Sequence, residues 1–73
     1  MKQVEIFKTN VREMAEAASI IRHLHAHFPN YRINFDLQDC DNVLRIETLN
    51  GDIDQKKIER LLTIRGYDCS HLL

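Results

Sequence analysis

The chain has 73 residues, and its 10 basic and 11 acidic side chains give a formal net charge of −1. This length suits one small domain, so we expect a single unit over residues 1–73. Hydrophobic residues make up 44% and charged residues 29%, which excludes a disordered chain, and the balanced charge argues against nucleic acid as a partner. No apolar run is longer than two residues, so we expect neither a signal peptide nor membrane insertion, and we expect a cytoplasmic location.

The first half of the chain predicts a strand followed by a long helix. Residues 2–8 alternate apolar and polar side chains, which is typical of a strand. Apolar residues then recur at three- and four-residue steps, which predicts an amphipathic helix over about residues 11–27. Asn10 and Glu13 have the spacing of a capping box, so we expect them to cap the start of this helix.

The second half predicts a hairpin, a second helix and a short last strand. Residues 31–37 alternate strictly, and residues 43–47 follow after a short polar connection, which predicts two antiparallel strands. Asp54 is expected to cap the second helix, and Gly66 is expected to end it. Residues 67–72 are long enough for one more strand.

The predicted element order is therefore β-α-β-β-α-β. Right-handed crossovers in each half put both helices on one face of a four-stranded antiparallel sheet. The expected fold is an α+β ferredoxin-like sandwich. We expect its uncovered sheet face to be polar and to carry Arg32, Asn34, Asp36, Arg45 and Glu47.

With this order and length, the chain resembles the heavy-metal-associated (HMA) domain, the module of copper chaperones and of the N-terminal tails of metal-pumping ATPases. The resemblance covers nearly the whole chain and includes the strand Ile33–Leu37. It also includes the stretch Ile64-Arg65-Gly66-Tyr67-Asp68, which is similar to the Gly-Tyr-(Asp/Glu) ending of bacterial members. The resemblance implies a metallochaperone-like role in metal ion binding or transport. It also implies that Tyr67 lies in a loop beside the metal site.

The metal motif of this family, Met-Thr/Ser-Cys-x-x-Cys, is missing. When the helices are matched, Asn10 and Glu13 take the positions of the two cysteines, and only Thr9 agrees with the motif. Amide and carboxylate oxygens are hard donors that do not replace two thiolates for Cu(I). We therefore expect the metal loop to be degenerate, with Asn10 and Glu13 not ligating, and we expect no cofactor.

Four other residues are weak metal candidates. His23 and His27 lie one helical turn apart and have the spacing to chelate a divalent ion, but a structural zinc site normally has four ligands. The alternative for these histidines is a solvated helix end that interacts favourably with the helix dipole. Cys69 and His71 share one face of the last strand, and the alternative for Cys69 is a small core thiol. Cu(I) or a divalent metal is thus implied by the resemblance alone.

The sequence contains no recognisable catalytic constellation, so we expect no enzyme. The leading interpretation is a non-enzymatic, HMA-like binding module that contacts a metal-transport protein. The alternative is a protein-interaction or regulatory module that self-associates through a sheet edge, without metal. The residues expected at that edge are Tyr31, Ile33, Phe35 and Leu37.

Overall fold

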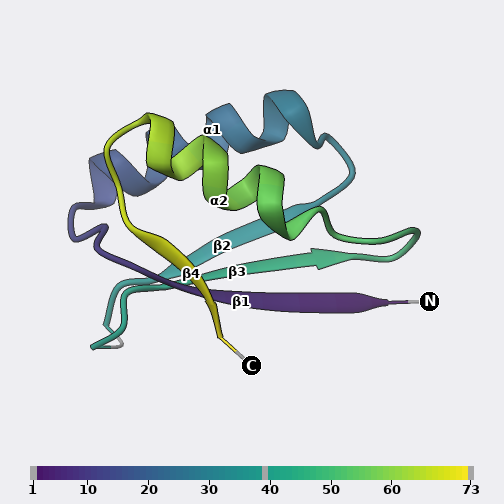
Figure 1. Ribbon diagram of the computed structural model, residues 1–73, viewed down its shortest axis with the longest axis horizontal. Coiled ribbons are helices and arrows are strands. Elements are labelled where there is room, and N and C mark those ends of the chain that lie inside the picture. The colour runs from purple at the N-terminus through teal and green to yellow at the C-terminus, as the bar shows by residue number, and fades with distance from the viewer. Residues whose placement is uncertain (1, 39, 73) are drawn as a thin grey trace.

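The computed structural model describes residues 2–38 and 40–72 and confirms the predicted fold class. Its elements are β1 (Gln3–Thr9), α1 (Met14–His27), β2 (Arg32–Asp36), β3 (Val43–Thr48), α2 (Gln55–Ile64) and β4 (Cys69–Leu72). The strands form one antiparallel sheet in the order β2-β3-β1-β4. Both helices cover the same side of this sheet (Figure 1). This is the α+β ferredoxin-like sandwich.

The core lies between the helix layer and the sheet. Helix α1 packs over β2, and α2 packs over β4. The largest fully buried side chains are Phe7, Val11, Ile20, Leu24, Leu44, Ile46, Ile58 and Leu62. Each large apolar side chain removed from water contributes about 1.5–3 kcal/mol, so this small set provides most of the driving force for folding.

Strand β1 leaves its most regularly spaced apolar residues on the uncovered face of the sheet. Val4 and Ile6 are each 37% exposed, whereas Phe7 is fully buried against the helices. The register pairs Ile6 with Arg45 on one side and with Leu72 on the other. The uncovered face is therefore less polar than predicted, because alternation alone does not tell which side of a strand faces the core.

Helix α1 begins at Met14, and the predicted capping box is wrong. Glu13 is the N-cap residue, with extended backbone angles, and its side chain makes no capping hydrogen bond. Val11 is fully buried, so the segment after β1 enters the core and does not form the first turn of the helix. The Asn10 side chain bonds to Asp68, far along the chain. Core burial and a long-range contact thus replace the local capping signal.

Helix α2 follows its sequence signals at both ends. The Asp54 carboxylate accepts a hydrogen bond from the Lys57 N–H at 3.1 Å, which confirms the predicted cap. Gly66 has φ +90° and follows Arg65, the C-cap residue of the helix. The Tyr67 N–H donates to the Leu62 carbonyl, which closes the helix end in the manner of a Schellman motif. This closure directs Tyr67 back toward helix α1.

Candidate functional site

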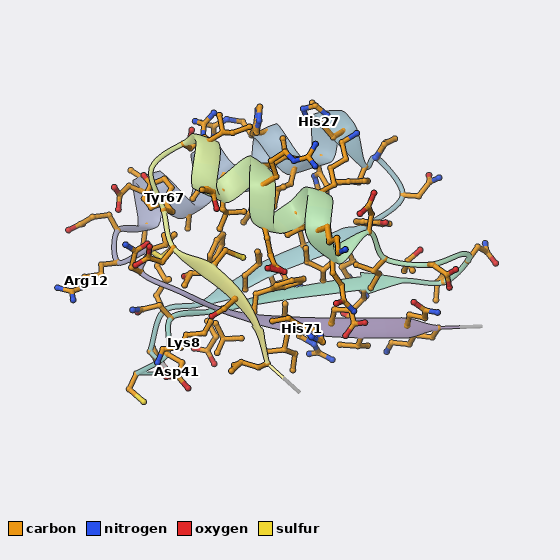
Figure 2. All side chains as sticks on the ribbon, in the orientation of Figure 1. Lys8, Arg12, His27, Asp41, Tyr67 and His71 are labelled. Atoms are coloured by element: carbon orange, nitrogen blue, oxygen red, sulfur yellow. The ribbon has the colours of Figure 1, made fainter. Side chains whose placement is uncertain are left out.

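The loop after β1 and the loop before β4 lie side by side. The Asp68 N–H donates to the Asn10 side-chain oxygen at 2.8 Å, and the Asn10 amide lies 3.4 Å from the Asp68 carboxylate. The Tyr67 hydroxyl donates to the Glu16 carboxylate at 2.9 Å, and this bond holds the pKa of Tyr67 above its ordinary value. Figure 2 shows Tyr67 and Arg12 at the same end of the molecule. This end is where the HMA resemblance would place a metal site.

Thr9, the one residue that agrees with the HMA motif, has a structural role. Its hydroxyl donates to the Asn42 carbonyl at 2.6 Å and accepts from the Val11 N–H at 3.2 Å. Its backbone N–H donates to the Asp41 carbonyl at 3.1 Å. Thr9 is only 5% exposed, so these bonds are shielded from water. The threonine connects the end of β1 to the chain that enters β3.

The donors at this end of the fold do not fit a soft metal ion. The side chain of Asn10 is engaged with Asp68, and Glu13 is an exposed carboxylate. Cys69 pairs with Thr9 in the sheet, but its thiol is partly buried, and this burial raises its pKa to about 12, with a smaller effect from Glu59. The thiolate is the metal-binding form of cysteine, and a thiol with this pKa stays protonated near neutral pH.

We expect a titration with Cu(I), run against a chelating competitor, to show no tight stoichiometric site. The physical reason is that one protonated thiol and two oxygen donors offer little to an ion that prefers sulfur. A tight site that survives Asn10→Ala and Glu13→Ala would contradict this assignment. Repeating that titration with Cys69→Ser would then tell whether the thiol or the histidines hold the ion.

The other candidate ligands do not form a metal cluster. The rings of His23 and His27 lie 5.1 Å apart between centroids. Figure 2 shows His27 at the end of α1 away from Tyr67. Burial, followed by the charges of Arg65 and His27, lowers the pKa of His23, which favours its neutral imidazole form. Within residues 2–38 and 40–72, no group of three or more His, Cys, Asp or Glu side chains has the arrangement to hold a metal ion.

His71 pairs with a carboxylate that the sequence analysis did not single out. Its Nε2 lies 2.7 Å from the Glu5 carboxylate, and the Gln55 amide donates to the other Glu5 oxygen at 2.6 Å. The hydrogen bond with His71 is the main reason why the pKa of Glu5 is lowered. Glu5 lies two residues before Phe7, on the same face of β1, and this spacing was the signal that could have placed it toward the helices.

Strand β2 offers unpaired backbone at one edge of the sheet. In the described part of the chain, β2 has a strand neighbour, β3, on one side only. A groove of about 440 Å³ runs between this edge and helix α1. Its apolar lining consists of Met14, Ala17, Ala18, Ile21, Phe35 and Leu37. The edge thus combines main-chain hydrogen-bonding groups with an apolar strip.

Two of the four residues expected at this edge are occupied inside the protein. Ile33 is 5% exposed and belongs to the core. Tyr31 stacks on Phe28 with ring centroids 4.6 Å apart, and its hydroxyl donates to the Asp52 carbonyl at 3.0 Å. The accessible surface is therefore smaller than the alternating pattern of residues 31–37 indicated.

Comparison of this chain with protein-family models, with curated proteins and with solved structures finds no match. Neither helix in the described residues has the length and apolar character needed to cross a bilayer.

Proposed function

We propose that this chain is a small, non-enzymatic protein-binding module that receives an extended peptide strand along β2. The observation that supports this proposal is the free edge of β2 beside the apolar groove under α1. An added strand gains affinity from main-chain hydrogen bonds and specificity from pockets for alternate side chains. The partner is therefore an extended protein segment with apolar residues at every second position.

Helix α1 determines which side chains such a strand can carry. Met14 is 78% exposed, and Ala18 and Ile21 continue its stripe at four- and three-residue steps. Because Ala18 is small and exposed, it leaves room above the edge of β2 for side chains of an incoming strand. Apolar side chains that enter there would cover the stripe and remove it from water.

Selection of displayed random heptapeptides on the purified protein tests this proposal. We expect the selected peptides to share apolar residues at alternate positions. Synthetic versions should bind the Ala18→Arg variant at least about tenfold more weakly, because a buried charge would lie in the groove. Ala26→Arg is the matched control, since Ala26 is exposed on the same helix but does not line the groove. Equal binding to the two variants, or no enriched peptide, would overturn the proposal.

A role in metal homeostasis is the second candidate, and it comes from the HMA resemblance. The contact between Asn10 and Asp68 supports it, because this contact holds the two loops side by side as the resemblance implies. In this candidate the chain docks on a metal-transport protein without carrying the ion. The expected lack of tight Cu(I) binding is compatible with that role, whereas binding of peptides at β2 is required only by the first candidate.

A further inference from the structure

We propose that the strand received by β2 is β2 of a second copy of this chain, antiparallel and centred on Asn34. This inference rests on the proposed function and names its partner. The register places Arg32 opposite Asp36 of the second copy, and Ile33 opposite Phe35 of the second copy. The two sheets then join into one continuous sheet, with a two-fold axis through the Asn34 pair.

The sequence around Asn34 is complementary to itself. The residues next to Asn34 are both apolar, Ile33 before it and Phe35 after it. The residues two positions away carry opposite charges, with basic Arg32 before Asn34 and acidic Asp36 after it. Directly opposed residues in an antiparallel pair project from the same face of the sheet. Unlike charges therefore meet on the uncovered face, and on the helix side Phe35 lies opposite Ile33, which is itself largely buried in the core. The two-fold symmetry forms each of these pairs twice.

The charges on the uncovered face favour an acid beside Arg32. Within the chain, Arg32 lies opposite Glu47 on β3. The Glu47 carboxylate is already 2.9 Å from the Lys2 ammonium and 3.6 Å from the Arg45 guanidinium. Three cations thus surround one carboxylate, and a second carboxylate next to Arg32 reduces the excess positive charge.

Asp36 stands at the opposite end of the strand from this basic group. It is exposed, and one carboxylate oxygen accepts from the Gln38 N–H at 3.2 Å. An ionised carboxylate has capacity for further hydrogen bonds after this one. A guanidinium of the second copy could therefore bind to Asp36 without displacing the bond from Gln38.

Other antiparallel registers lose these charge pairs. Sliding one strand by two residues places Asn34 opposite either Arg32 or Asp36. Sliding by four residues places Arg32 opposite itself or Asp36 opposite itself, and like charges directly opposite destabilise a sheet. The register centred on Asn34 is therefore the one that pairs base with acid at both ends.

Helix α1 contributes to the same surface. A two-fold axis perpendicular to the sheet keeps the helices of both copies on one side. Since α1 packs over β2, the two α1 helices then face each other across the axis. The stripe of exposed Met14 and Ala18 and half-buried Ile21 lies along the groove at this position, so its counterpart in the second copy meets it. The second copy thereby covers both the strand edge and the apolar stripe.

Charge reversal tests the register. We expect sedimentation equilibrium across micromolar to millimolar concentrations to show a reversible dimer of the unmodified chain. Arg32→Asp and Asp36→Arg should each weaken the dimer at least about tenfold, because each turns two attractive pairs into two repulsive ones. An equimolar mixture of the two variants should restore the dimer, because an acidic β2 then faces a basic β2. Arg60→Asp, an exposed reversal on α2, is the matched control and should leave the dimer unchanged.

The outcomes separate this inference from the proposed function. Restored association in the mixture also shows that each variant is folded, and circular dichroism of each variant alone checks the same point. If the unmodified chain stays monomeric, the second copy is excluded as partner, while the heptapeptide selection still decides whether β2 binds a strand. If the chain dimerises but neither reversal weakens the dimer, the register and the β2 interface are both wrong.

Discussion

Phe7→Ala is expected to lower the free energy of unfolding by about 3–5 kcal/mol, the range for removing a buried aromatic ring. Phe7 is fully buried, and its ring lies 5.4 Å from that of His71 between centroids. A domain of this length has a total stability of about 4–11 kcal/mol, so this loss removes a large share of it. Urea unfolding followed by circular dichroism measures the loss.

Ile6→Ala is the control for this variant. Ile6 is the neighbouring residue on β1 but faces the uncovered side of the sheet, where it is 37% exposed. Its replacement should lower the free energy of unfolding by about 1 kcal/mol or less. If Ile6→Ala proves more damaging than Phe7→Ala, the two faces of β1 have been assigned the wrong way round.

The second large effect is expected at Thr9, where loss of the hydroxyl should destabilise the fold more than loss of the methyl group. Thr9→Val keeps the shape of the side chain but leaves the Asn42 carbonyl and the Val11 N–H without their partner. Shielded polar groups that lose their hydrogen bonds destabilise a protein, and we expect the free energy of unfolding to fall by about 2–3 kcal/mol. The same urea titration provides the measurement.

Thr9→Ser separates the hydroxyl from the methyl group. Serine keeps both hydrogen bonds and removes one buried methyl, so the free energy of unfolding should fall by about 1 kcal/mol. The serine variant is therefore expected to be the more stable of the two. The reverse order would mean that packing of the methyl group, not the hydroxyl bonds, accounts for the threonine.

The parts of the fold that sequence predicted correctly have local signals. Asp54 and Gly66 act within a few residues of themselves, and both ends of α2 lie where these residues indicate. The predicted start of α1 is wrong because the true start depends on contacts with residues far away in the sequence. Asn10 bonds to Asp68, and Val11 is buried in a core that includes residues of both helices and of strands β1, β2 and β3. A pattern confined to four neighbouring residues carries no information about such competition.

The candidate site also has one feature that the sequence predicts and others that it does not. The edge position of β2 follows from the element order and the crossover rule, so it could be predicted. The side chains that remain accessible at this edge could not be predicted, because Tyr31 stacks on Phe28 and donates a hydrogen bond to the Asp52 carbonyl. The pair of Glu5 and His71 also depends on register between two strands at opposite ends of the chain.

The central place of β1 in the sheet has a consequence for biosynthesis. Its two neighbours, β3 and β4, are both translated after it, and residues 6–9 pair with residues 69–72. Strand β1 therefore lacks one neighbour until β4 is made, and such sequence-distant pairing slows folding relative to a helical bundle. Until β4 pairs, the nascent chain exposes one edge of β1, so chaperone contact during synthesis should concentrate on β1.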